Sequence, residues 1–115
     1  MKLPSPIPPD LAEMIAARMR VIADANRIRI LDQLREGELS VGELTERLGT
    51  SQQNVSKHLG VLLQAGIVAR RKEGTSSLYS VADRGVYELC EQVCGGLQAQ
   101  LAGLTALIEG AASAG

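Results

Sequence analysis

Amide, hydroxyl and amine side chains gather in one short stretch of the chain, and their chemistry suits the recognition of base edges. They are Ser51, Gln52, Gln53, Asn54, Ser56 and Lys57. Glutamine and asparagine can each form two hydrogen bonds with N6 and N7 of adenine, and lysine can contact phosphate or guanine. On the first turns of a helix, such residues predict contact with the DNA major groove. The ordinary alternative is a polar helix face that meets only solvent.

Cys90 and Cys94 are the two cysteines of the chain, and a spacing of four residues puts both thiols on one side of a helix. Two sulfurs suit a soft metal or metalloid ion, such as arsenite or cadmium, whose remaining ligands would come from Glu91 or a partner chain. Thiol oxidation is a second interpretation, although a disulfide would strain an intact helical turn. Burial as small apolar residues is the third. The sequence leaves these three open and predicts no certain cofactor.

His58, the only histidine, lies next to the same polar stretch. A histidine can act as a pH-sensitive switch, a metal ligand or a structural residue. Metal sites that rest on a lone histidine, with no thiol or carboxylate nearby in the sequence, are uncommon. We therefore expect His58 to have a structural role or to contact the DNA backbone.

The polar stretch falls on the second of two short helices that a tight turn should connect. Ser40 and Glu43 have the spacing of a capping box, which starts a helix at Val41, and Gly49 suits the left-handed residue that ends it. Ser51 then caps the second helix. The apolar face of this helix consists of Val55, Leu59, Leu62 and Leu63. The pattern predicts a helix-turn-helix, and it favours groove contact over exposure to solvent alone.

Two further helices are expected before the helix-turn-helix. Apolar residues recur at helical spacing over about residues 10–22, and a second apolar face carries Ile28, Leu31 and Leu34 before the turn at Gly37. Residues 1–9 hold all four prolines and predict a flexible, extended arm. The folded domain is therefore expected over residues 10–109, with a short flexible tail at 110–115.

After these helices the pattern changes to that of a short β-hairpin, with strands expected at residues 67–71 and 77–81. Three basic residues stand next to a tip formed by Gly74 and Thr75. A basic hairpin of this kind can lie on the phosphate backbone or reach into the minor groove. We expect DNA contacts here from Arg70, Arg71, Lys72 and Thr75.

The last helix carries an apolar stripe whose members alternate three and four residues apart. They are Val86, Cys90, Val93, Leu97, Leu101, Leu104 and Ile108. This seam is longer than the core of so small a domain can cover, so part of it should pack against a second copy of the chain. We expect a homodimer, with the first helix taking part in the interface.

Composition favours a single folded domain and gives only a local indication of a nucleic-acid partner. The chain has 115 residues, of which 45% are hydrophobic, enough for one packed core. Its net charge is −1, but the basic residues cluster and none follows Arg84. No apolar run reaches the ~20 residues of a membrane span, and the N-terminus lacks the features of a signal peptide, so we expect a cytoplasmic protein without a membrane partner.

The helix-turn-helix and its flanking stretches resemble the ArsR/SmtB family of bacterial sensor-repressors, over about residues 12–108. The resemblance is carried by ADANRIRILDQL (23–34), ELSVGELTERLGTSQQNVSKHLGVLLQAGIVARRKEG (38–74) and SLYSV (77–81). It implies a dimeric winged helix-turn-helix that represses transcription at an operator and leaves the operator when an inducer binds.

The metal sites of that family are not matched in this sequence. Ser40-Val41-Gly42 stands where the family has a Cys-x-Cys pair, no histidine follows Asp83, and the expected second helix has no cysteine. The remaining candidate for inducer sensing is the pair Cys90 and Cys94.

The expected fold is mainly α-helical with a small β-hairpin, a winged helix-turn-helix paired through its first and last helices. Its expected function is sequence-specific repression on double-stranded DNA, with release by a soft metal, a metalloid or a thiol-reactive inducer. A winged-helix regulator without a metal site and a module that binds another protein are the alternatives. An enzyme is not expected, since there is one histidine and no phosphate-binding glycine loop or pair of catalytic carboxylates.

Overall fold

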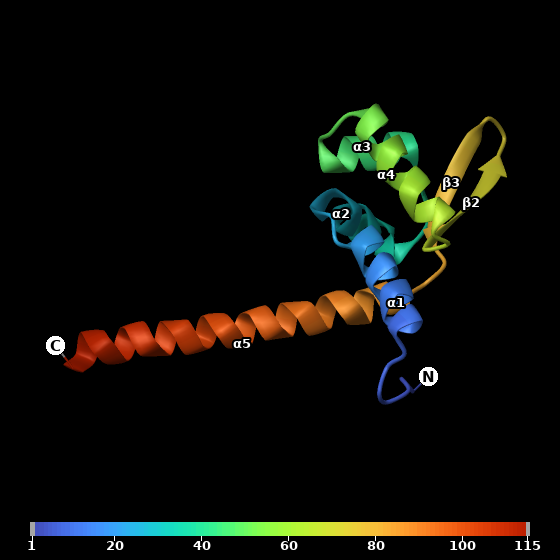
Figure 1. The fold of residues 1–115 in the computed structure, drawn as a ribbon. Helices are drawn as coiled ribbons and strands as arrows, with labels where there is room; N and C mark the ends of the chain where they lie inside the picture. Colours follow the sequence, from blue (N-terminus) through green and yellow to red (C-terminus); the bar gives the residue numbers. More distant parts are fainter. Residues whose placement is uncertain (1, 115) are drawn as a thin grey trace. The chain divides into compact units, whose positions relative to one another are not determined.

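A computed structural model describes residues 2–114, with side chains described as far as residue 110. In chain order the elements are α1 (Pro9–Ile22), α2 (Ala25–Gln33), the 3₁₀ turn η1 (Leu34–Glu36), β1 (Leu39–Ser40), α3 (Val41–Leu48), α4 (Gln52–Gln64), β2 (Val68–Glu73), β3 (Ser76–Val81) and α5 (Gly85–Ala114) (Figure 1). The chain divides after Asp83 into two compact units. The helices α1 to α4 and the sheet form the first unit, and α5 belongs to the second.

Asp24 separates α1 from α2 because its side chain caps the second helix. One carboxylate oxygen accepts hydrogen bonds from the backbone N–H groups of Asn26, at 2.9 Å, and Arg27, at 3.3 Å. The buried residues of α2 and η1 are Ile30, Leu31 and Leu34. Ile28 is exposed, which corrects the expected apolar face, because the three buried residues centre that face and Ile28 falls beyond its edge.

The turn between α3 and α4 has the local structure that its residues predict. Ser40 Oγ accepts from the Glu43 backbone N–H at 3.1 Å, and Glu43 Oε1 accepts from the Ser40 backbone N–H at 3.0 Å, so the capping box is confirmed. Gly49 ends α3 with a φ of +65°, a conformation that a residue without a Cβ adopts readily. Ser51 begins α4, and its Oγ accepts from the Asn54 backbone N–H at 3.1 Å.

An aliphatic core holds the first unit together. Its fully buried side chains are Ile30, Leu31, Leu34, Leu44, Val55, Leu59, Leu62, Ile67 and Val68. Three of these come from α4, which packs against α2, α3 and β2, while Leu63 is only half-buried. The packing turns the opposite face of α4 away from the core.

The sheet has three antiparallel strands in the order β1-β3-β2, whereas the sequence predicted the hairpin alone. The missed strand β1 is two residues long, too short to show an alternating pattern, and pairs Leu39 with Tyr79 and Ser40 with Leu78. The hairpin strands are longer than expected and pair from Val68–Val81 to Glu73–Ser76. The tip at Gly74 and Thr75 extends away from the helices (Figure 1).

The second unit opens with buried residues and continues as an exposed apolar stripe. Val86 and Tyr87 are buried, and the guanidinium of Arg84 lies 5.2 Å from the centroid of the Tyr87 ring. Five members of the expected stripe are 54–61% exposed, namely Val93, Leu97, Leu101, Leu104 and Ile108. The helix continues to Ala114, past the end expected at residue 109. Among the described residues, no helix combines the length and apolar character needed to cross a membrane.

Candidate nucleic-acid interface

The outward face of α4 presents most of the polar stretch to solvent. Its exposed members are Ser51, Gln52, Gln53, Ser56 and Lys57. The helix is oriented by Val55, Leu59 and Leu62, which are fully buried on the side opposite Gln53 and Lys57. Ser51 and Gln52 are exposed because they stand at the start of the helix. The three buried residues fix the helix against the core. The exposed amides of Gln52 and Gln53 and the amine of Lys57 therefore project from a rigid element, as recognition of base edges requires.

Asn54 differs from its neighbours because its side chain is engaged within the protein. Its Nδ2 donates to Thr50 Oγ1 at 3.1 Å, and the residue is half-buried. Its backbone N–H already donates to Ser51, so Asn54 organises the turn before α4 as well as the first turn of the helix. Thr50 was missed from the sequence, although its place four residues before Asn54 is the spacing at which helical side chains meet.

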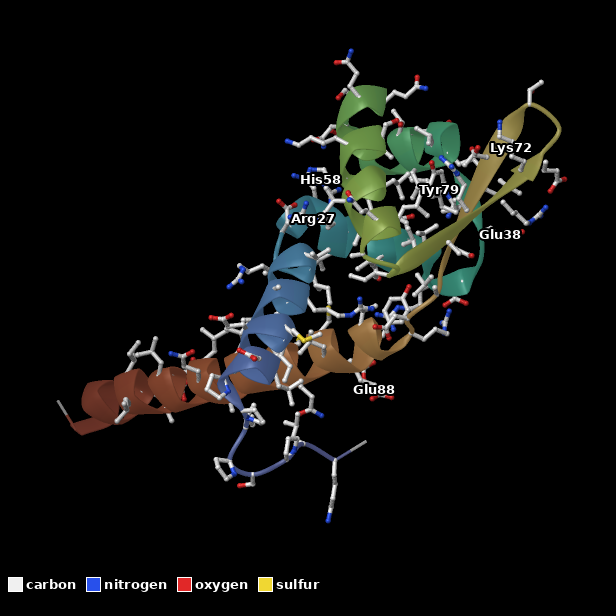
Figure 2. All side chains as sticks on the ribbon, turned by 45° about the vertical axis from the view of Figure 1, so that its right-hand side comes forward. Arg27, Glu38, His58, Lys72, Tyr79 and Glu88 are labelled. Carbon is white, nitrogen blue, oxygen red and sulfur yellow. The ribbon has the colours of Figure 1, made fainter. Side chains whose placement is uncertain are left out.

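His58 does not lie with the exposed residues of α4. Its side chain is 4% exposed, and its Nδ1 lies 4.0 Å from Asp24 Oδ1 without a hydrogen bond. Figure 2 shows His58 beside Arg27 of α2. Of the two roles expected for His58, its burial agrees with the structural one, and the expected contact with the DNA backbone is corrected. The sequence held a signal for this outcome, since residue 58 follows Val55 by three positions and precedes Leu62 by four.

The carboxyl of Asp24 stays ionised beside His58. Partial desolvation raises its pKa, but hydrogen bonds from the backbone N–H groups of Arg27 and Asn26, with the nearby charge of Arg27, hold the pKa of Asp24 below its usual value. Asp24 therefore both caps α2 and lies beside the buried His58 on the inner side of α4.

The hairpin divides its three basic residues between the two faces of the sheet. Arg70 pairs with Tyr79 and Lys72 with Ser77, so both lie on the face that carries the buried Tyr79. Arg70 and Lys72 are exposed and continue that face from Tyr79 along β2. Lys72 and Tyr79 are labelled in Figure 2. Thr75 is exposed at the tip itself.

Arg71 lies on the opposite face of the sheet and is paired with two carboxylates. Its Nη2 is 2.6 Å from Glu38 Oε1 and 2.7 Å from Glu73 Oε2. Hydrogen bonds from Arg71 hold the pKa of Glu38 below its usual value, and those carboxylates raise the pKa of Arg71. The expected basic cluster of three residues is thus two exposed cations and one paired cation. No sequence signal pointed to Glu38, which is 33 residues away from Arg71.

The cysteines lie on α5 as free thiols, with Cys90 half-buried and Cys94 exposed. In the part of the chain that the structure describes, no three His, Cys, Asp or Glu side chains gather closely enough to hold a metal ion. Two thiols are too few to close a site for trigonal arsenite or tetrahedral zinc. The residues of one chain therefore do not fit a resident metal.

Comparisons with known proteins agree with this geometry. A family described as a helix-turn-helix domain matches residues 22–71. The transcriptional regulator KmtR of Mycobacterium tuberculosis is 36% identical over 75% of this chain and 66% of its own length. The transcriptional regulator NmtR of the same organism is 35% identical over 76% of this chain and 73% of its own length.

A solved structure extends the likeness to the fold. It is the homodimeric winged helix-turn-helix DNA-binding domain of a possible ArsR-family regulator from Mycobacterium bovis. That domain superimposes with a TM-score of 0.68 at 29% identity, covering 80% of this chain and 85% of its own. The shared architecture of helices and hairpin confirms the expected winged helix-turn-helix.

Proposed function

Since this chain belongs to the ArsR/SmtB family of DNA-binding transcriptional regulators, we propose that it acts as a homodimeric repressor and sets α4 into the major groove of its operator. The exposed polar face of α4, opposite a fully buried apolar face, carries this proposal. Gln52 and Gln53 would bind base edges, and Lys57 would contact phosphate. Arg70, Lys72 and Thr75 of the hairpin would meet the DNA backbone or minor groove.

A homodimer is supported by the apolar surface that a single chain leaves open. The stripe on α5 is exposed over four helical turns, and α1 exposes Met14 and Met19. Stripes of this size on one chain indicate a protein partner, and the related domain from Mycobacterium bovis is homodimeric. A two-fold dimer would present its two α4 helices about one turn of DNA apart, ~34 Å, on a palindromic operator.

Two substitutions on α4 should have different effects on operator binding. Lys57→Ala should weaken binding to all DNA and lower the slope of log affinity against log salt by about 1 for each phosphate that the lysine no longer neutralises. Gln52→Ala should reduce discrimination at one base position in each half-site by about 1–3 kcal/mol and leave the slope unchanged. Fluorescence anisotropy with the upstream DNA and single-base variants, over a range of salt concentrations, measures both effects.

Gln64→Ala is the matched control, because Gln64 is an exposed amide at the far end of the same helix. It should bind as the parent does. If Lys57→Ala and Gln52→Ala also bind like the parent, α4 is not the recognition helix. A parent protein that binds its upstream DNA no better than random duplex at ~0.15 M salt would favour the alternative, a module that binds another protein.

We extend the proposal to release from the operator by a thiol-directed inducer at Cys90 and Cys94. One chain supplies two sulfurs at the spacing of one helical turn, and a dimer would supply the equivalent pair from the partner. A soft metal or metalloid ion or a persulfide would react with such thiols in the cytoplasm, where cysteines are kept reduced. Cys90 belongs to the apolar stripe and Cys94 directly follows its next member, Val93. Modification of the two thiols would therefore act at the surface that pairs the two chains.

Titration of the operator complex with arsenite, cadmium, zinc and a persulfide donor tests inducer release. We expect an agent to release DNA from the parent and to leave the Cys90→Ser and Cys94→Ser variants bound, as followed by anisotropy. Ser80→Ala, a half-buried position on the sheet, should respond as the parent does. Release of none of the complexes, or equal release of all of them, would assign the two cysteines to packing alone.

A further inference from the structure

Arg71 is held by two carboxylates on the face of the sheet opposite Tyr79, Arg70 and Lys72. Its Nε donates to both oxygens of Glu38, at 3.0 and 2.8 Å, and its Nη2 donates to Glu38 Oε1 at 2.6 Å. The same Nη2 lies 2.7 Å from Glu73 Oε2. Pairs in which one guanidinium meets a carboxylate through two nitrogens are geometrically specific as well as strong. This group of three side chains is here called the Arg71 clasp.

The Arg71 clasp crosses the central strand of the sheet. Arg71 of β2 pairs with Leu78 of β3, and Leu78 also pairs with Ser40 of β1. Glu38 directly precedes β1, so the guanidinium reaches over β3 from one edge strand to the other. Ser40 ends β1 and caps α3. The clasp therefore connects the hairpin to the first residues of the helix-turn-helix.

The position of the clasp is where the hairpin loses its third strand. The pairing of β1 with β3 involves only Leu78 and Tyr79, and β2 and β3 continue beyond it as a two-stranded ribbon to the turn at Gly74. Two-stranded ribbons twist and bend easily when nothing supports them. Arg70 and Lys72 lie on this ribbon, so their placement depends on what holds its base.

We propose that Arg71 is a positioning residue of the DNA-binding surface, and that its clasp by Glu38 and Glu73 holds the hairpin so that Arg70 and Lys72 meet the operator backbone. The proposal rests on the proposed function, which puts those two cations at DNA. Arg71 lies on the opposite face of the sheet from them and already has two anionic partners. A phosphate would have to displace both carboxylates and leave them unpaired beside a polyanion.

Removal of the charge on Glu38 distinguishes this role from a direct contact. If Arg71 bound phosphate, Glu38 would compete with DNA, and Glu38→Gln would tighten operator binding by freeing the guanidinium and removing a repulsive charge. If Arg71 positions the hairpin, Glu38→Gln weakens operator binding although it makes the chain less acidic. The sign of the change decides between the two roles.

Operator anisotropy on the full chain, with Glu38→Gln, Arg71→Gln and the double variant, tests the clasp. We expect each single variant to weaken binding by about 3- to 10-fold, the scale of removing one exposed ion pair from each hairpin of a dimer. The double variant should bind no more weakly than the weaker single variant, since both changes remove one interaction. Glu36→Gln removes an exposed carboxylate two residues before Glu38 and should bind at least as tightly as the parent.

Charge reversal separates positioning from an effect on folding. Arg71→Glu alone should bind weakly, and its combination with Glu38→Arg should recover most of the parent affinity, because the pair re-forms with its charges exchanged. A direct DNA contact by Arg71 would not be recovered by this combination. Parent-like or tighter binding by Glu38→Gln, or a failure of the reversed pair to recover affinity while its thermal unfolding matches the parent, would overturn the proposal.

One further variant distinguishes a failure of the clasp proposal from a failure of the proposed function. Arg70→Gln combined with Lys72→Gln should weaken binding and lower the salt dependence. If this variant binds like the parent, the hairpin does not contact DNA and the proposed function fails at that point. If it weakens binding while Glu38→Gln does not, only the role of the clasp is wrong.

Discussion

Replacement of Leu97 and Leu101 with aspartate is expected to give a folded monomer that binds its operator at least about 100-fold more weakly than the parent, because each chain would then reach one half-site alone. Both leucines are more than half exposed in the single chain, so the monomer has little packing to lose there. In a dimer, however, four new carboxylates would be buried in one apolar seam without partners. Sedimentation equilibrium and operator anisotropy measure the two effects.

The matched control places the same number of charges on another side of the same helix. Ala99→Asp with Ala102→Asp alters two exposed residues about half a turn away from Leu97 and Leu101. This variant should remain a dimer and bind the operator like the parent. A dimer that survives Leu97→Asp with Leu101→Asp would contradict the α5 seam as the interface.

Leu59→Ala is expected to lower the free energy of unfolding by about 2–5 kcal/mol, the range for removing a leucine from a closely packed core. Leu59 is fully buried on α4, where that helix packs against α2 and α3. A domain of this size is stabilised by only about 5–15 kcal/mol, so the variant would lose a large share of its stability. Urea unfolding followed by circular dichroism, at one fixed protein concentration, gives the value.

Leu63→Ala is the comparison for that measurement, because Leu63 lies next to the same stripe but is only half-buried. It should lose less than about half as much stability, in proportion to the smaller area removed from water. Equal losses at the two positions would mean that the buried face of α4 is not the one described. The recognition face would then have to be redrawn, since it is defined as the side opposite Leu59.

The elements predicted correctly are those whose signals lie within a few neighbouring residues. The capping box of Ser40 and Glu43 and the left-handed Gly49 involve hydrogen bonds and backbone angles inside one short segment. The apolar face of α4 follows from helical spacing in the same way, so the exposure of Gln53 and Lys57 on the opposite face could be predicted. For such features, the residues of one short segment determine the local structure.

Some elements were predicted only in part, because their structure depends on contacts with distant segments. The strand β1 has two residues, and its pairing with Leu78 and Tyr79 depends on a segment far along the chain. Ile28 fitted a helical stripe with Leu31 and Leu34 and is exposed. In the folded chain Ile30 is buried beside those two leucines in its place. A periodic pattern indicates which residues could be buried, but contacts with neighbouring elements determine which of them are.

The order of residues was sufficient to establish a capped helix-turn-helix, a basic hairpin and an apolar seam on the last helix, since each follows from propensities and spacing between near neighbours. Three-dimensional packing was needed to turn His58 inward beside Asp24 and to join Arg71 to Glu38 across 33 residues. The reason is physical: a side chain has the same chemistry on either face of a strand or helix. Which groups surround it depends on segments that meet only in the folded chain.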